Sequence, residues 1–94
     1  MDNRLTTIAL YHGRDVQLAK LAEECAELAA AVLKLRLKPY DMDAYRHAAE
    51  EMADVGIMLD QIQYLLASKA TTDRYREKKI VRELNRIERA VKWP

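Results

Sequence analysis

The sequence contains no phenylalanine, one tryptophan, one cysteine, two glycines and two prolines among its 94 residues. So few turn-forming residues argue against an all-β fold, which needs frequent turns. Half of the residues are hydrophobic and a third are charged, which is typical of a folded chain and not of a disordered one. Alanine, leucine and the long charged residues predominate and favour helix. We therefore predict one all-α domain, an antiparallel helical bundle, over residues 1–94.

A core without phenylalanine has to be built from leucine, isoleucine, valine, alanine and methionine. Such a core is thin for a domain of this length, so we expect it to be completed by oligomerisation, as a homodimer or homotetramer. The single cysteine, Cys25, excludes an intrachain disulfide and a cysteine-based zinc site. A lone thiol fits a reducing compartment, so we expect a cytoplasmic protein. No segment has the pattern of a signal peptide or a membrane span.

The charge is unevenly distributed along the chain. Residues 1–68 carry 7 basic and 11 acidic side chains, a balance of −4, whereas residues 69–94 carry 9 basic and 4 acidic ones, a balance of +5. The whole chain has a net charge of +1, so nucleic acid is not an expected partner on global charge alone. An acidic body with a basic last segment suits a site for a metal and a polyanion, and it equally suits a solvated last helix.

The hydrophobic spacing predicts three main helices. The first runs over about residues 15–36 and ends before Pro39, because the residue before proline avoids the α region. The second begins after Asp41 or Asp43, either of which can cap it, and ends near residues 68–69. The third follows a cap at residues 71–73. The first eleven residues form one or two further helical turns, which Gly13 interrupts.

Three-four spacing assigns a core stripe to each helix. The predicted stripes are Leu18, Leu21, Cys25, Leu28, Val32 and Leu35; Ala48, Met52, Val55, Leu59, Ile62 and Leu66; and Ile80, Leu84, Ile87 and Val91. We expect Cys25 to be a buried, inert thiol. Gly56 is expected to mark a close helix–helix approach, because glycine within a helix is otherwise costly.

The first two predicted helices share an acidic pattern. Residues 22–28 read A-E-E-C-A-E-L and residues 49–55 read A-E-E-M-A-D-V. Side chains three apart lie on the same side of a helix, so each pattern presents a carboxylate pair. The pairs are Glu24 with Glu27 and Glu51 with Asp54. Lys20 and Arg46, each four residues before an acid, can offset part of the repulsion within each cluster.

Helices joined by a short loop usually lie antiparallel and adjacent, which would let the two carboxylate pairs face each other. Four carboxylates that converge in a partly dry space cannot all stay ionised without a cation. Hard oxygen ligands at this density suit Mg²⁺ or Mn²⁺. Two exposed polar stripes are the plainer interpretation. His47 lies one turn before Glu51 and is a candidate to support that carboxylate.

The paired motifs resemble the signature of the MazG-like all-α nucleoside triphosphate pyrophosphohydrolases, E-E-x-x-E on one helix and E-E-x-x-D on the next. Here these are residues 23–27 and 50–54, and the resemblance covers about residues 11–80. It implies that Glu24, Glu27, Glu51 and Asp54 are Mg²⁺ ligands. It also implies cleavage of a nucleoside triphosphate between the α- and β-phosphates, to the monophosphate and pyrophosphate, by a dimer or tetramer.

Two further roles follow from that chemistry. A carboxylate beside the metal would orient or deprotonate the attacking water, and of the spare acids Glu23 and Glu50 we choose Glu23. Lys78, Lys79 and Arg82 would hold the β- and γ-phosphates or the leaving pyrophosphate, since ammonium and guanidinium groups both bind phosphate.

Two alternatives remain open from the sequence. The first is another enzyme of the same scaffold, such as the phosphoribosyl-ATP pyrophosphohydrolase of histidine synthesis, or an enzyme for dUTP, dCTP or damaged nucleotides. The second is a non-catalytic helical oligomer that binds an acidic partner or nucleic acid through its basic last helix.

Overall fold

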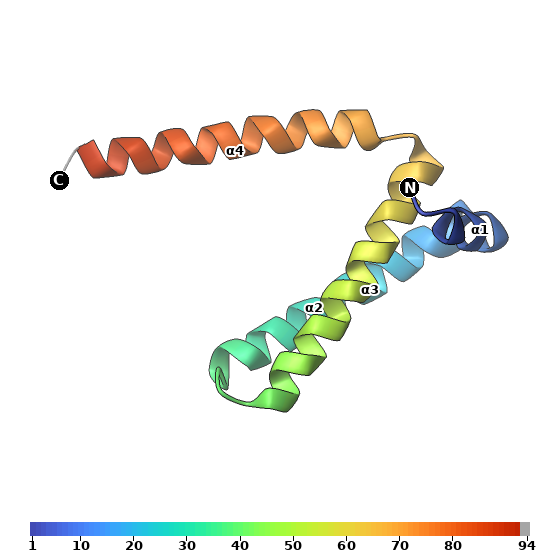
Figure 1. Cartoon of the computed structure of the whole chain (residues 1–94), viewed down its shortest axis with the longest axis horizontal. Helices are drawn as coiled ribbons and strands as arrows, with labels where there is room; N and C mark the ends of the chain where they lie inside the picture. Colours follow the sequence, from blue (N-terminus) through green and yellow to red (C-terminus); the bar gives the residue numbers. More distant parts are fainter. Residues whose placement is uncertain (93–94) are drawn as a thin grey trace.

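The computed structural model describes residues 1–92, and every regular element in that range is a helix. The four helices are α1 (Asn3–His12), α2 (Arg14–Leu37), α3 (Met42–Leu66) and α4 (Lys69–Lys92) (Figure 1). The first three pack together as a bundle, whereas α4 contacts α3 alone. The all-α prediction is therefore confirmed. None of these helices is both long and apolar enough to cross a membrane.

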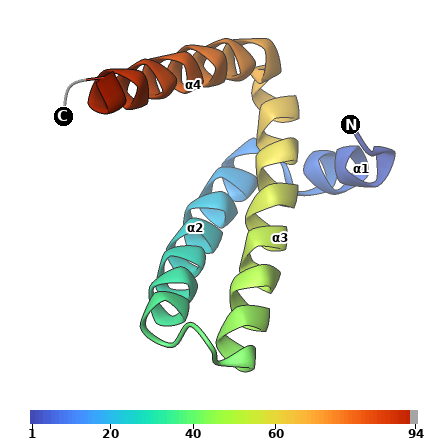
Figure 2. The ribbon, with the colours of Figure 1, turned by 60° about the vertical axis from the view of Figure 1, so that its left-hand side comes forward.

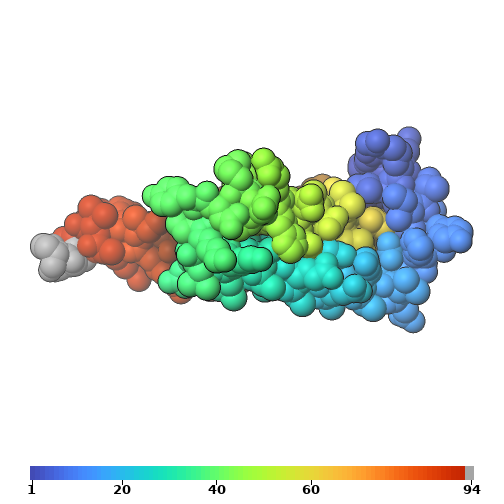
Figure 3. All heavy atoms as spheres, turned by 90° about the horizontal axis from the view of Figure 1, so that it is seen from below, coloured from blue at the N-terminus to red at the C-terminus, as the bar shows by residue number. Residues whose placement is uncertain are grey.

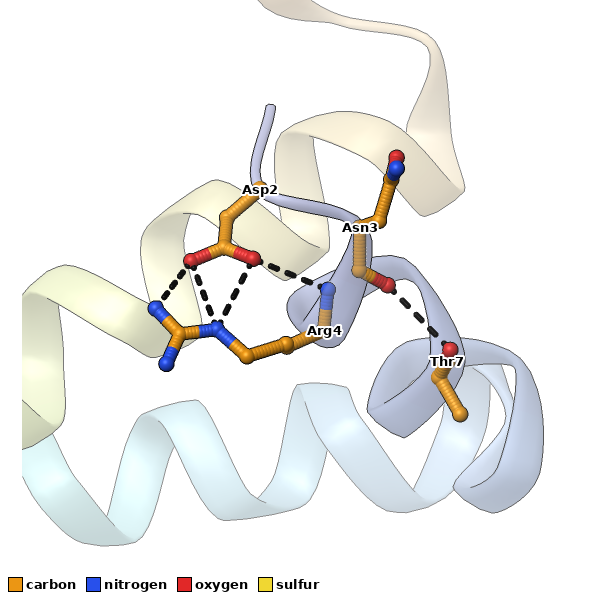
Figure 4. A network of polar contacts seen from close by, with 4 residues as sticks. All are labelled: Asp2, Asn3, Arg4 and Thr7. Atoms are coloured by element: carbon orange, nitrogen blue, oxygen red, sulfur yellow. Dashed lines mark hydrogen bonds and ion pairs between the residues drawn. The ribbon is translucent and has the colours of Figure 1, made fainter.

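The short helix α1 is fixed at its start by Asp2. Its carboxylate accepts a hydrogen bond from the backbone N–H of Arg4 at 2.9 Å and is paired with the Arg4 guanidinium at 2.6 Å (Figure 4). These contacts lower the pKa of Asp2 to about 2. The Thr7 hydroxyl also donates to the Asn3 carbonyl at 3.2 Å. The Asp2 carboxylate therefore satisfies an N–H group that the first turn of a helix otherwise leaves unpaired.

Gly13 separates α1 from α2, as the sequence predicts. Its φ of 85° is a conformation that glycine adopts without a steric penalty, and its N–H donates to the Ala9 carbonyl at 2.9 Å. The second helix then continues to Leu37. Pro39 follows two residues later and prevents further extension.

The Asp41 carboxylate caps α3 by accepting from the N–H groups of Asp43 at 2.9 Å and Ala44 at 3.2 Å. The helix ends at Leu66, where Ala67 adopts a left-handed φ of 50°. The cap predicted at residues 71–73 is wrong, because α4 already begins at Lys69. Threonine is a weak helix former but not a helix breaker, so these residues fit inside the first turns.

The helices α2 and α3 form an antiparallel hairpin and contact each other along their length (Figures 2 and 3). We call the line of contact the inner seam. On α2 it comprises the buried residues Gln17, Glu24 and Ala31 and the half-buried Leu21, Leu28 and Leu35. On α3 it comprises Ala44, Ala48, Glu51, Val55, Met58, Gln61 and Ile62, all buried. Helix α1 packs mainly on α3 and also on α2.

The residues of the inner seam differ from the predicted core stripes. Cys25 and Val32 on α2 are exposed, so the thiol is not the buried group that we expected. On α3, Met52, Leu59 and Leu66 are exposed as well. Three-four spacing fits two adjacent seams on each helix equally well. The predicted stripes lie partly on the more apolar seam, whereas the hairpin packs through the seam that contains the acids.

Helix α4 extends away from the hairpin (Figure 1). Between Lys69 and Lys92 no residue is buried, and the predicted stripe of Ile80, Leu84, Ile87 and Val91 is exposed. The radius of gyration is 17.0 Å, whereas a compact domain of this length has about 12 Å. The prediction that this stripe is core is therefore wrong for the single chain.

Candidate metal centre

The inner seam brings three of the four predicted metal ligands together. Glu24 from α2 and Glu51 and Asp54 from α3 each offer one carboxylate oxygen, and these oxygens all lie within 4.8 Å of one another. The antiparallel arrangement produces this cluster, because it places the middle of α2 beside the middle of α3. The predicted convergence of the two acidic patterns is present in the structure.

Two of these carboxylates are removed from water. The side chain of Glu24 is 8% exposed and that of Glu51 is 11% exposed. The Glu24 Oε2 and Glu51 Oε2 atoms are buried and have no hydrogen-bond partner. A buried carboxylate oxygen without a partner is costly, since it has lost water and gained nothing in return. The pair therefore has unused capacity to bind a positively charged ligand.

One basic group stands beside each buried carboxylate. The Lys20 ammonium lies 3.1 Å from Glu24 Oε1 and 3.6 Å from Glu23 Oε1, which agrees with the role predicted for it. His47 Nε2 lies 3.4 Å from Glu51 Oε1, so it is placed to support Glu51. Arg46 behaves differently from the prediction, because it pairs with Asp43 at 3.3 Å on its own helix.

The pKa values of Glu24 and Glu27 are shifted in opposite directions. The pKa of Glu24 lies below its usual value, first because Lys20 donates a hydrogen bond to it, and burial opposes this effect. Lys20 in turn has a raised pKa, chiefly because of the same hydrogen bond. The pKa of Glu27 is raised, first by the negative charge of Glu24, then by burial and by the charge of Glu51. Glu27 therefore lies within the field of the cluster, although it is not one of the three converging ligands.

The remaining predicted residues lie around or away from this cluster. Glu23 and Glu50 are exposed on α2 and α3. Lys78, Lys79 and Arg82 are exposed on α4, which has no contact with α2 in the described part of the chain. The Lys78 ammonium instead lies 5.9 Å from the centre of the Tyr75 ring on the same helix. A single chain does not bring these basic groups to the acids.

A buried amide pair in the inner seam has no counterpart in our sequence predictions. The Gln17 side-chain amide donates to the Gln61 side-chain oxygen at 2.7 Å, and the two residues are 4% and 2% exposed. Gln61 also donates to the Ile57 carbonyl at 3.2 Å. Gln17 precedes Glu24 by seven residues and Gln61 follows Asp54 by seven. That heptad relation to the acids is the signal that could have identified the pair.

The donor set suits a hard divalent cation. It consists of carboxylate oxygens only, with no cysteine and with a histidine in contact with a carboxylate. Mg²⁺ and Mn²⁺ prefer such ligands, whereas zinc prefers nitrogen and sulfur. The two buried oxygens without partners are the feature that a cation would satisfy.

Comparison with protein-family models, with curated proteins and with solved structures finds no match to this chain.

Proposed function

We propose that this protein is a Mg²⁺-dependent nucleotide pyrophosphohydrolase, which cleaves a nucleoside triphosphate between the α- and β-phosphates. The observation that carries the proposal is the convergence of the buried Glu24 and Glu51 with the half-buried Asp54, together with two carboxylate oxygens that lack a hydrogen-bond partner. The paired acidic motifs and their resemblance to the MazG-like enzymes supply the reaction. Mn²⁺ is an alternative cofactor, because it accepts the same ligands.

In this proposal Glu24, Glu51 and Asp54 hold the cation, and Glu27 completes the set from the next turn of α2. A bound divalent cation supplies charge neutralisation for the triphosphate and polarises the α-phosphorus. Lys20 keeps Glu24 ionised through its hydrogen bond, so the site is ready to bind a cation at neutral pH. His47 orients the Glu51 carboxylate from one side.

Glu23 is the proposed group that orients or deprotonates the attacking water. It is exposed and shares Lys20 with Glu24, so it stands at the solvent side of the cluster. The proposed phosphate contacts, Lys78, Lys79 and Arg82, can reach the acids only if α4 changes its direction or belongs to another copy of the chain. Phosphate binding by these three residues therefore depends on the position of α4 or on the assembly.

The substrate class is tested with purified protein and a panel of nucleoside triphosphates, deoxynucleotides and phosphoribosyl-ATP. We expect monophosphate and pyrophosphate as products with Mg²⁺ or Mn²⁺, and none with EDTA. Glu24→Gln should reduce kcat/KM by at least ~100-fold, since it removes a charged ligand from the site. Glu83→Gln, an exposed substitution on α4, is the matched control. Turnover that persists in EDTA or in Glu24→Gln would contradict the proposal.

The non-catalytic alternative rests on a different observation, the exposure of the whole basic helix α4. In that case Glu24→Gln would leave partner binding unchanged. Binding to duplex DNA that weakens steeply with salt, together with no turnover on the panel, would favour this second function.

A further inference from the structure

The connection between α3 and α4 is a short elbow formed by Ala67 and Ser68. Ala67 has a left-handed φ of 50°, which is unfavourable for a residue with a β-carbon. Its N–H donates to the Tyr64 carbonyl at 3.1 Å, and the Ser68 N–H donates to the Gln63 carbonyl at 2.9 Å. Beyond the elbow no residue of α4 is buried. The direction of α4 therefore depends on the two elbow residues and not on packing further along the helix.

Helix α3 carries a line of exposed residues, which no other helix covers in the described part of the chain. We call it the outer line, and it lies one residue after the inner seam. A β-carbon added at Gly56 in this line would meet no heavy atom within 4 Å. Since glycine disfavours helix, its presence without a close neighbour indicates room for a helix to approach. The outer line comprises Tyr45, Ala49, Met52 and Gly56, all exposed, and continues to the half-buried Gln63.

The outer line and the apolar stripe of α4 both face the inside of the elbow. A cavity of about 560 Å³ lies there, and it is lined mainly by Met1, Asp60, Gln63, Tyr64, Lys69 and Ala70. Gln63 belongs to the outer line. Lys69 lies three turns before Ile80, the first residue of the stripe, and so on the same side of α4. In Figure 1 both α4 and the hairpin extend to the left of the elbow. The two lines therefore face each other across the cavity.

The spacing of the two lines matches residue by residue. A chain that turns back at Ser68 sets residues equally far before and after it level with each other, because both helices rise equally per residue. Gly56 and Ile80 each lie twelve residues from Ser68. Two of the resulting pairs set a small residue against isoleucine, as close packing of helices requires. The pairs are Gly56 with Ile80, Met52 with Leu84, Ala49 with Ile87, and Tyr45 with Val91.

Helix α4 also has the length that is needed to cover the outer line. It has 24 residues and α3 has 25, and two antiparallel helices can be joined by a loop of only about two residues. The charges beside the pairs oppose each other, because Glu88 would come near Arg46 and Glu77 would come near Asp60. Exposed charge pairs contribute little. Contact between the two lines would therefore depend on the apolar pairs.

We propose that α4 is a hinged arm, which closes onto the outer line by rotation at Ala67 and Ser68 and exchanges with the more populated open form of Figure 1. In the closed form the outer line and the stripe cover each other, so neither is available to a helical partner. Asp54 lies two residues before Gly56 and therefore on the opposite side of α3. Lys78 lies opposite Ile80 on α4 for the same reason. Closure thus hides apolar surface and leaves the candidate metal centre and the basic side of α4 exposed.

Disulfide trapping tests this proposal, because it captures a form that is present only part of the time. The trapping variant carries Ala49→Cys and Ile87→Cys together with Cys25→Ser, which removes the exposed natural thiol. The matched control carries Arg89→Cys in place of Ile87→Cys, because Arg89 lies on the opposite side of α4. On mild oxidation we expect an internally linked monomer, which migrates faster on a non-reducing gel. It should form at least ~10-fold faster than in the control, since a disulfide needs its two β-carbons close together.

A second pair of variants tests whether the stripe drives closure. Ile80→Asp, added to the trapping variant, should slow the cross-link by ~10-fold, because closure would bury a charge. Asn85→Asp, on the other side of α4, should leave the rate unchanged, and circular dichroism checks that both proteins keep their helix content. Equal rates in the trapping variant and its control, or no effect of Ile80→Asp, would overturn the proposal. A covalent dimer in place of the linked monomer would also overturn it, because α4 would then reach another copy. None of these measurements depends on catalysis or on metal binding.

Discussion

The hairpin of α2 and α3 and the helix α4 are built from segments of similar length but differ in what they bury. The inner seam of the hairpin contains two glutamates and two glutamines, all buried. Helix α4 has a regular apolar stripe over residues 80–91, and none of the helix's residues is buried. Regular hydrophobic patterning therefore does not decide burial here. Burial is decided by whether a neighbouring helix covers the residues. The hairpin retains polar groups in its inner seam at the place where a binding site is proposed.

The largest expected effect is on the free energy of unfolding, when the same substitution is made in the two regions. Ile62 in the inner seam is 7% exposed, and Ile87 in the stripe of α4 is 52% exposed. Ile62→Ala should lower the free energy of unfolding by about 2–5 kcal/mol, because it leaves a cavity. Ile87→Ala should change it by no more than about 0.5 kcal/mol. Urea unfolding of both variants, followed by circular dichroism, measures the difference.

A large loss in Ile87→Ala would break this comparison, since it would show that the α4 stripe is buried in solution. Repeating the unfolding at several protein concentrations then separates burial against a second copy from burial within one chain. Only the former makes the loss depend on concentration.

The next effect concerns stabilisation by a cation. If the three carboxylates bind Mn²⁺ only in the folded chain, the free energy of unfolding should rise by ~2.7 kcal/mol when free Mn²⁺ is 100 times its dissociation constant. Thermal unfolding with and without Mn²⁺ measures this rise. It should be absent in Glu51→Gln, which removes a charged ligand from the hairpin, and unchanged in Glu88→Gln on α4. Equal stabilisation of both variants would place the ion elsewhere.

The buried amide pair gives a smaller effect within the hairpin. Gln17→Leu leaves Gln61 without its partner, so unfolding should become easier by about 1–3 kcal/mol. Adding Gln61→Leu removes the unpaired group and should recover much of that loss, because an apolar pair fills the same layer. A urea double-mutant cycle measures the coupling. Additive losses would show that the hydrogen bond contributes little.

Some features of the hairpin could be predicted from the sequence and others could not. The helices, the Asp41 cap and the meeting of the acidic motifs follow from local spacing and a short connection. The choice between adjacent seams does not, because residues 17, 24 and 31 repeat as regularly as residues 18, 25 and 32. The predicted stripe contains the apolar Leu18 in place of the polar Gln17, although a buried polar residue can be stable when its partner lies on the facing helix. That partner, Gln61, lies 44 residues away on the facing helix.

The smallest expected effect is the pH dependence of the stability of the hairpin. Glu27 has a raised pKa because it lies near Glu24 and Glu51. A group of this kind contributes stability that is fully present below its unfolded pKa, about 4.5, and is lost as the pH rises through its folded value. Glu24 acts in the opposite sense, because Lys20 lowers its pKa, and its contribution is lost as the pH falls.

Without metal, Glu27→Gln should therefore be more stable than the natural chain at neutral pH, and the difference should shrink as the pH is lowered toward the unfolded pKa. Thermal unfolding in EDTA across this range measures it. Excess Mg²⁺ should reverse the order at neutral pH, because only the natural chain keeps the fourth carboxylate. Glu83→Gln on α4 should show neither behaviour. If Mg²⁺ leaves the order unchanged, Glu27 is a neighbour of the metal site and not a ligand in it.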